Sequence, residues 1–284
     1  MVFSSLLFLF RFLPAVLILY YIAPRKLRNV ILLLFSLFFY AWGEPKYVFL
    51  MLFTITMDFF IGKGIDKAKK EGNQKKAKRF LMTSILVDLS ILGFFKYADF
   101  LIGTVNTLTG AGIPLLGIPL PIGISFFTFQ ILSYVIDLYR GRYPVQKNIL
   151  NLALYISFFP QLIAGPIVRY VDIDRQLESR THSTQKAMEG IRRFLYGLGK
   201  KVLIANVLGQ CVDSIYAMEL SEVTGAFAWL AAGMYMLQIY YDFSGYSDMA
   251  IGLGKLFGFD FPENFNYPYL SKSVQEFWRR WHIS

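Results

Sequence analysis

Long apolar segments recur along the chain, and they limit its possible folds more than any other feature. About 20 apolar residues in helical form are needed to cross a bilayer. The sequence is 55% hydrophobic and 18% aromatic, well above the average of soluble domains. It therefore predicts an all-α, polytopic integral membrane protein that forms one domain over residues 1–284. The segments predicted to lie in the membrane, about eight in number, are 6–23, 30–43 with 46–62, 80–102, 121–138, 149–168, 202–218 and 225–243.

Lysine and arginine between these segments predict the orientation of the chain. Loop 24–29 carries three cations, and loop 63–79 carries eight against two acidic residues. Loop 103–120, on the other predicted side, has no charge. Short loops rich in lysine and arginine stay in the cytoplasm. The N-terminus is therefore predicted to lie outside the cell membrane.

Segment 149–168 does not fit this alternation as a full crossing. Basic loops precede and follow it, and two cytoplasmic loops cannot flank a single crossing. The segment also contains Pro160, Gly165 and Pro166. Irregular backbone at membrane depth is stable only inside protein or beside a water-filled cavity. We therefore predict a re-entrant segment that lines a polar cavity.

The net charge of +10 does not indicate a nucleic-acid partner. The cations lie between apolar segments instead of along one folded face, which predicts contact with membrane lipid. Cys211 is the only cysteine, so no intrachain disulfide is predicted. We expect its side chain to be buried as a small hydrophobic group; the alternative is that it carries an acyl group. Asp172 and Asp174 have a spacing common in charged loops, so no metal site is predicted. His182, in a hydrophilic loop, is predicted to be solvated.

Polar side chains within the apolar segments are the first candidates for a functional site, because each is costly at membrane depth unless it is paired or hydrated. In segment 121–138, Gln130, Ser133 and Asp137 recur at helical spacing and share one face. We interpret Gln130 as part of the lining of a polar passage. The alternative is a polar face buried against other helices, with Asp137 paired to Arg140.

Two further segments carry such residues. Gln161 lies in the predicted re-entrant segment, and Asp242 and Ser244 lie at the end of the last apolar segment. We interpret all three as lining of the same passage. Gly254 and Gly258, one helical turn apart, are predicted to let two helices pack closely. No strand pattern precedes these glycines and no Lys-Ser/Thr pair follows, so a nucleotide-binding loop is not predicted.

The C-terminal residues predict a short amphipathic helix. Ser273 and Glu276 have the spacing of a capping box. The helix would place Phe277, Trp278, Trp281 and His282 at successive turns, with Arg279 on the polar side. An interfacial helix with a tryptophan belt explains this pattern without chemistry. Burial beside aromatic rings would instead favour the neutral form of His282, which can accept a proton near pH 7.

Three stretches of the sequence are long and specific: PIGISFFTFQILSYVIDLYRG, FFPQLIAGPI and YYDFSGYSDMAIGLGKLFGFDFPENFNYPYLSKSVQEFWRRWHIS. Together they resemble the membrane-bound O-acyltransferase family, and within it the branch of bacterial alginate O-acetyltransferases. The D-alanyl transferase of teichoic acid synthesis resembles the chain more distantly. The resemblance implies a ring of transmembrane and re-entrant helices in the bacterial inner membrane, around a thin partition with a polar funnel on its outer side.

The resemblance also implies an activity. An acyl group, here acetyl, would pass from a cytoplasmic thioester, acetyl-CoA or an acyl carrier protein, to a hydroxyl of an extracytoplasmic polysaccharide or to an acetyl-handling partner protein. No bound cofactor is expected. His282 matches the first of two functional histidines of the family, and the second lies further along. We therefore expect the chain to be the N-terminal portion of a longer protein.

The site expected from the resemblance and from polarity combines eight residues. They are His282 as the catalytic residue, Trp278, Trp281 and Arg279 along the path of the donor, and Gln130, Gln161, Asp242 and Ser244 in the polar lining. The alternative functions are D-alanyl transfer to teichoic acid, a scaffold that binds an acyl-handling partner, and a transporter with broken helices around a polar passage. Many transporters have two related halves, and the sequence shows no internal repeat.

Overall fold

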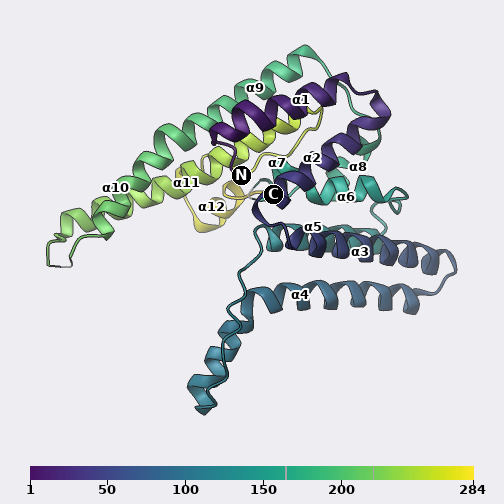
Figure 1. Ribbon diagram of the computed structural model, residues 1–284, viewed down its shortest axis with the longest axis horizontal. Helices are drawn as coiled ribbons and strands as arrows, with labels where there is room; N and C mark the ends of the chain where they lie inside the picture. Colours follow the sequence, from purple (N-terminus) through teal and green to yellow (C-terminus); the bar gives the residue numbers. More distant parts are fainter. Residues whose placement is uncertain (164, 220) are drawn as a thin grey trace. The chain divides into compact units, whose positions relative to one another are not determined.

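The computed structural model describes residues 1–163, 165–219 and 221–284. These residues form helices joined by loops (Figure 1). The α-helices are α1 (Leu13–Ile22), α2 (Arg28–Gly43), α3 (Tyr47–Lys70), α4 (Gln74–Thr109), α5 (Ile124–Tyr139), α6 (Ile149–Ser157), α7 (Phe159–Leu162), α8 (Tyr170–Glu178), α9 (Thr184–Gly199), α10 (Asn206–Tyr216), α11 (Gly225–Leu256) and α12 (Val274–Arg280). The π- and 3₁₀-helical turns are η1 (Phe8–Phe12), η2 (Arg25–Leu27), η3 (Lys200–Ala205) and η4 (Pro268–Leu270).

This architecture confirms the prediction of an all-α chain. The described ranges contain no β-strand, and their one β-type pairing is an isolated bridge between Phe265 and Trp281. Among the described residues, two helices are able to cross a membrane by length and composition, Arg25–Gly43 and Tyr47–Lys70. Shorter apolar helices occupy Phe8–Ile22 and Ile124–Tyr139. The ring of crossing helices and the outside N-terminus therefore stay predictions.

The chain divides into two compact units. Unit 1 comprises Met1–Leu17, Ala164–Val168 and Glu178–Ser284, and unit 2 comprises Ile18–Ile163 and Arg169–Leu177. Each unit combines segments that are far apart in the sequence, so the chain passes between the units several times. The single domain over residues 1–284 stays a prediction.

In unit 2, helices α3, α4 and α5 pack against one another (Figure 1). Asp58 of α3 and Asp88 of α4 are buried there, and the Ser84 hydroxyl oxygen lies 2.5 Å from a carboxyl oxygen of Asp58 and 3.3 Å from one of Asp88. Neither aspartate was singled out from the sequence. Both lie inside predicted apolar segments, and that position was the available indication, because a carboxyl group at such depth needs a polar partner.

The part of the predicted re-entrant segment that lies in unit 2, residues 149–163, is a broken helix. Helix α6 ends at Ser157, Phe158 leaves helical geometry (φ −55°, ψ 111°), and α7 begins with Pro160 in its first turn. At 1.5 Å per residue, the nine residues of α6 extend about 14 Å, roughly half of the hydrocarbon core of a bilayer. The break agrees with the prediction that this segment does not cross as one helix.

In unit 1, α9 and α11 run antiparallel and touch at backbone distance through two pairs of glycines. A Cβ atom added to Gly190 would lie 2.8 Å from the carbonyl oxygen of Gly252, and one added to Gly197 would lie 2.5 Å from that of Gly245. No other residue fits at either contact without moving a helix, because both obstacles are backbone atoms.

The glycines predicted to allow this packing were the wrong ones. Gly254 faces the Phe261 ring, where an added Cβ would lie 2.9 Å from a ring carbon. Gly258 lies beyond the end of α11 at φ +87°, a left-handed conformation that suits glycine. Their spacing of four residues indicated a helix face. In the actual contact, the two glycines of each helix are seven residues apart: Gly190 and Gly197 on α9, and Gly245 and Gly252 on α11.

We predict that Gly197→Ala destabilises unit 1 by about 1–3 kcal/mol, the usual cost of overpacking, because its Cβ would meet the backbone of Gly245. Gly199→Ala is the matched control, since a Cβ at Gly199 meets nothing within 4 Å. Both changes gain the same helix propensity. Thermal unfolding of the purified protein in detergent measures the difference, and equal melting temperatures of the two variants would contradict the glycine contact.

Candidate functional site

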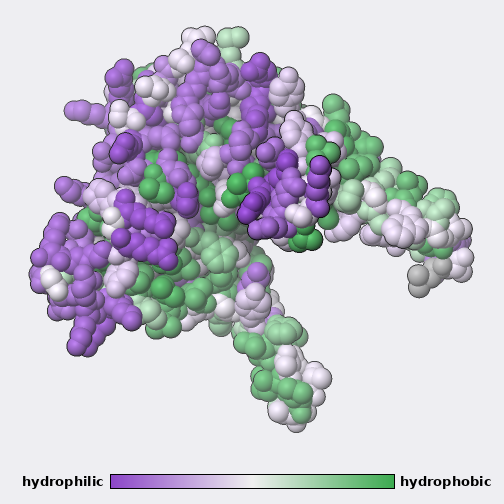
Figure 2. All heavy atoms as spheres, turned by 180° about the vertical axis from the view of Figure 1, so that it is seen from behind, coloured by the Kyte–Doolittle hydropathy of each residue, from purple (hydrophilic) through white to green (hydrophobic). Residues whose placement is uncertain are grey.

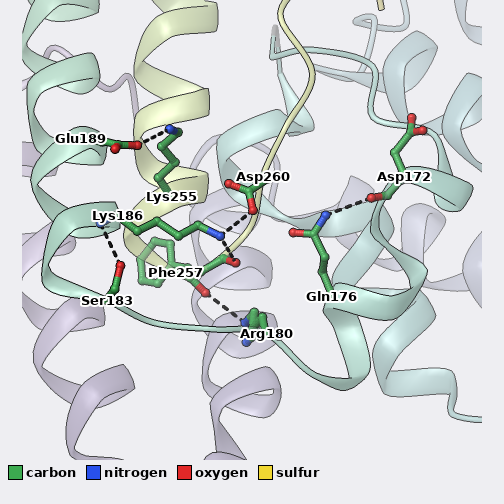
Figure 3. A network of polar contacts seen from close by, with 10 residues as sticks. Asp172, Gln176, Arg180, Ser183, Lys186, Glu189, Lys255, Phe257 and Asp260 are labelled. Carbon is green, nitrogen blue, oxygen red and sulfur yellow. Dashed lines mark hydrogen bonds and ion pairs between the residues drawn. The ribbon is translucent and has the colours of Figure 1, made fainter.

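A polar network fixes the point at which the chain leaves α11 in unit 1 (Figure 3). The Lys186 ammonium donates hydrogen bonds to the Asp260 carboxylate (2.6 Å) and to the Gly258 carbonyl (2.8 Å). The Arg180 guanidinium donates to the Phe257 carbonyl (2.9 Å). The side chains of Arg180 and Lys186 thus hold residues 257–260 near the start of α9, so the following segment begins from a fixed position.

The following segment pairs with the C-terminal residues in antiparallel fashion. The Asn266 amide donates to the Arg280 carbonyl (2.9 Å), and the Ile283 amide donates to the Asn264 carbonyl (3.0 Å). Between these bonds, Phe265 and Trp281 form the isolated bridge. The pairing places the last residues of the chain against the body of unit 1.

Because of this pairing, the C-terminal helix ends earlier than predicted. Helix α12 ends at Arg280; Trp281 is extended (φ −104°, ψ 125°) and His282 is left-handed (φ +48°). Trp281 and His282 therefore do not share a helix face with Trp278. The physical reason is competition: the backbone of residues 280–283 bonds with residues 264–266, which lie far away in the sequence.

The predicted start of α12 is correct. The Ser273 hydroxyl oxygen accepts a hydrogen bond from the Glu276 amide (3.1 Å). The Glu276 carboxylate accepts from the Lys272 amide (2.9 Å) instead of the Ser273 amide, and also from Arg280 (2.9 Å). These bonds lower the pKa of Glu276 below its ordinary value, the Lys272 amide contributing most.

Asn264 connects the two residues after His282 to helix α11. Its side chain is fully buried; the amide nitrogen donates to the Ser247 hydroxyl (2.8 Å), and the amide oxygen accepts from the Ser284 hydroxyl (2.9 Å). The Ser284 hydroxyl oxygen in turn accepts from the Ile167 amide (2.9 Å). Because the Asn264 carbonyl also holds Ile283, the two residues after His282 are fixed from one buried side chain and its backbone.

His282 itself lies half-buried against an aromatic side chain. Its ring centroid is 5.0 Å from that of Phe243. Burial lowers the pKa of the His282 imidazole below its ordinary value of 6.5. The neutral ring is therefore the main form at pH 7, as predicted from the sequence. A neutral imidazole has one nitrogen able to accept a proton.

The residues expected along the path of the donor have different surroundings. Trp278 is 63% exposed, and Arg279 is also exposed. Trp281 packs in an aromatic cluster, edge-on to Phe265 at 5.1 Å and stacked with Phe277 at 5.6 Å between ring centroids. Trp281 therefore has a packing role, whereas the exposed faces of Trp278 and Arg279 are open to a ligand.

A cleft of about 550 Å³ adjoins the C-terminal residues of unit 1. The residues that surround it include Arg193, Lys200, Tyr240, Asp248, Asn266 and Ile283. Asp248 accepts from Arg193 and from Lys200, each at 2.7 Å. Arg193 and Lys200 were not singled out from the sequence, because their side chains reach Asp248 only through the close contact of α9 with α11.

The two predicted lining residues of unit 1 differ in their hydrogen bonding. Asp242 is half-exposed and pairs with Lys201 at 2.7 Å. Ser244 is buried, and its hydroxyl has no hydrogen-bond partner in the described part of the chain. Ser244 retains free hydrogen-bonding capacity, whereas Asp242 is already neutralised by a cation.

The two predicted lining residues of unit 2 are fully buried amides. Neither polar atom of the Gln130 side chain has a partner among the described residues. The Gln161 nitrogen donates to the Tyr155 carbonyl (2.5 Å), and its oxygen is without a partner in the same ranges. Buried amide atoms with unused capacity suit a site that holds water or another polar group. On the same helix as Gln130, Asp137 pairs with Arg142 at 3.0 Å and with Arg140 at 3.8 Å, as the alternative interpretation predicted.

Two further predictions concern single residues. Cys211 is exposed, so the prediction of a buried hydrophobe is wrong. Helix α10 buries Gly209 and Val212 instead, and Cys211 falls on its other side. His182 is exposed, as predicted.

Residues 34–284 match the model of the membrane-bound O-acyltransferase family. The chain belongs to this family. It is 47% identical over 288 residues to the probable alginate O-acetylase of Pseudomonas aeruginosa, a match that covers all of this chain and 55% of that protein. The peptidoglycan O-acetyltransferase of Helicobacter pylori is 34% identical over 318 residues, covering all of this chain and 59% of that protein.

The resemblance to D-alanyl transferases is weaker, as predicted. The teichoic acid D-alanyltransferase of Bacillus subtilis is 29% identical over 171 residues, which cover 57% of this chain and 42% of that protein. The chain spans little more than half of the length of the acetyl-transferring relatives. Membership of the family makes the chain a membrane protein, whereas its own activity and substrates remain proposals.

We predict that His282 takes up a proton only below the ordinary histidine pKa of about 6.5. The chain has two histidines, so His182→Gln leaves His282 as a single signal in nitrogen-15 spectra of histidine-labelled protein. At pH 6.5, the two ring nitrogens should lie closer to the shifts of neutral imidazole than those of a solvated histidine, because the pKa is lowered. A titration midpoint above 6.5 would show that the ring is not desolvated.

We also predict that Asn264→Ala loosens the backbone at His282, because it removes the bonds to Ser247 and Ser284. Loss of a buried side chain with such bonds costs about 1–3 kcal/mol. In the same spectra, the His282 signal should move toward the shifts of a solvated ring. Asn266→Ala is the matched control, since Asn266 donates to Arg280 through its backbone amide, which alanine retains.

Proposed function

We propose that the protein is part of a membrane O-acyltransferase that moves an acetyl group from a cytoplasmic thioester to a hydroxyl of an extracytoplasmic polysaccharide or to a partner protein that relays it. The observation that carries this proposal is the family match over residues 34–284, together with full-length similarity to proteins named for alginate and peptidoglycan O-acetylation. Fixed geometry around His282 supports a chemical role at this end of unit 1.

In the proposed reaction, the acceptor oxygen attacks the thioester carbonyl carbon, the carbon–sulfur bond breaks, and the acceptor proton passes through a neutral imidazole to the leaving sulfur. The resemblance gives the role of base to a second histidine beyond Ser284 and a supporting place on the acyl path to His282. The lowered pKa of His282 favours such a place, because a neutral ring can take up and pass on a proton beside the base.

Two groups of residues have the chemistry that the proposed reaction needs, one to bind the donor and one to line a path for polar groups. Arg279 is exposed beside Trp278 and can meet the phosphates of coenzyme A or of a carrier's prosthetic group. In unit 2, the unused hydrogen-bonding atoms of Gln130 and Gln161 suit a lining for polar groups, and in unit 1 the Ser244 hydroxyl has the same unused capacity. We assign Gln130 and Gln161 to the polar lining of unit 2, and Ser244 to that of unit 1.

D-alanyl transfer to teichoic acid is the second candidate. The 29% identity to the Bacillus subtilis D-alanyltransferase supports it, but that match covers 57% of the chain. The acetyl-transferring relatives match the whole chain at higher identity. Acetyl transfer is therefore the function that the similarity favours.

We predict that His282→Ala lowers acetyl transfer by roughly 10²-fold or more, the usual contribution of a residue that handles protons. The measurement uses membranes that contain the full protein, supplied with radiolabelled acetyl-CoA or acetyl-carrier protein, and follows label in polysaccharide. His182→Ala is the matched control, because His182 is the other histidine of the chain and is exposed. Unchanged transfer by His282→Ala would remove His282 from the site, and labelled D-alanine transfer alone would favour the second candidate.

A further inference from the structure

The first turns of α4, in unit 2, carry cations on one face of the helix. Lys75, Lys78 and Arg79 are spaced i, i+3 and i+4, so they point to the same side. All three are exposed. In the ranges 1–163, 165–219 and 221–284, none of the three takes part in an ion pair, whereas the neighbouring Lys70 pairs with Asp66 at 2.7 Å.

The same face continues as an apolar stripe. Met82, Leu86 and Leu89 follow Lys75 at seven, eleven and fourteen residues, which keeps them in line with it on a helix of 3.6 residues per turn. They are 43%, 60% and 45% exposed, respectively. In the part of the chain that the structure describes, no other element covers this stripe, and such an exposed apolar face on a membrane protein suits lipid chains.

Polar and aromatic side chains mark the far end of the stripe. Lys96 and Tyr97 lie on the same face, with the Lys96 ammonium 5.5 Å from the centroid of the Tyr97 ring. At 1.5 Å per residue, Arg79 and Lys96 are about 26 Å apart along the helix, close to the thickness of a hydrocarbon core of about 30 Å. Tyrosine and lysine are typical of the membrane interface. The stripe therefore has about the length of a hydrocarbon core, with cations at each of its ends.

The hydropathy of the surface around α4 also separates a charged end from an apolar end. Figure 2 shows hydrophilic residues gathered over the tip of the α3–α4 hairpin, whereas the opposite end of α4 is mostly hydrophobic. The hairpin loop 63–79 has eight lysines and arginines against two acidic residues. A surface with this excess attracts anions at low ionic strength.

We propose that this face of α4 binds an anionic phospholipid, with the phosphate group on Lys75, Lys78 and Arg79 and an acyl chain along Met82, Leu86 and Leu89. Basic residues directly beside a membrane segment favour anionic lipids by about a factor of five for each cation. The continuous apolar stripe selects lipid over an acidic protein, because a soluble partner would leave the stripe uncovered. The proposal does not depend on the proposed acyl transfer.

The test uses the full protein in nanodiscs that contain spin-labelled phosphatidylglycerol or spin-labelled phosphatidylcholine. Electron paramagnetic resonance measures the fraction of each label that the protein immobilises. The wild-type protein should prefer phosphatidylglycerol, and the triple variant Lys75→Gln, Lys78→Gln, Arg79→Gln should lose at least about fivefold of that preference. Raising the salt concentration should weaken the wild-type preference, since the cations are exposed.

Two matched variants separate this site from the general charge of the hairpin. Glutamine at Lys67, Lys70 and Lys76 removes the same charge from lysines that already have acidic partners, and it should change the preference by less than about twofold. Exchanging Lys75→Arg, Lys78→Arg and Arg79→Lys keeps the charge and should keep the preference. Equal losses in the two glutamine variants, loss in the charge-preserving variant, or no preference in the wild-type protein would each overturn the proposal.

Discussion

Close approach of two helix backbones is the constraint on which unit 1 depends. Glycines at 190 and 197 of α9 meet glycines at 252 and 245 of α11, so the helices touch without intervening side chains. At this distance, Arg193 and Lys200 of α9 reach Asp248 of α11 and bind it from two sides. A buried carboxylate is stable in such surroundings because it is paired. The glycine contact and the ion pairs therefore support each other.

Helix α11 also determines where the C-terminal residues lie. Ser247 of α11 receives a hydrogen bond from Asn264, and Asn264 holds Ile283 and Ser284. His282 is thus attached to α11 through one buried asparagine and through its own ring contact with Phe243. The residues after α11 are themselves held by Arg180 and Lys186 near the start of α9. Hydrogen bonds thus fix both ends of the segment between α11 and α12, at Arg180 and Lys186 on one side and at Asn264 on the other.

Local patterns could be predicted from the sequence, whereas contacts between distant residues could not. Apolar segments predicted helices such as α2, α3 and α5, and the spacing of Ser273 and Glu276 predicted the start of α12, because both depend on neighbours within a few residues. Helices α8 and α9 lie outside every predicted segment. The end of α12 depends on pairing with residues 264–266, which no local pattern contains. The polar lining residues were found by type, but the sequence did not separate Asp242, which has a cation, from Ser244 and Gln130, which have unused hydrogen-bonding atoms.

The left-handed backbone at His282 restricts which residues can occupy that position. A residue with a side chain costs about 1–2 kcal/mol in this conformation, and asparagine, aspartate and histidine adopt it more readily than others. Valine or isoleucine would be strained there whatever the chemistry requires. The backbone at position 282 therefore restricts the residue through its geometry, independently of the imidazole, and asparagine is the replacement that removes the ring while leaving the turn intact.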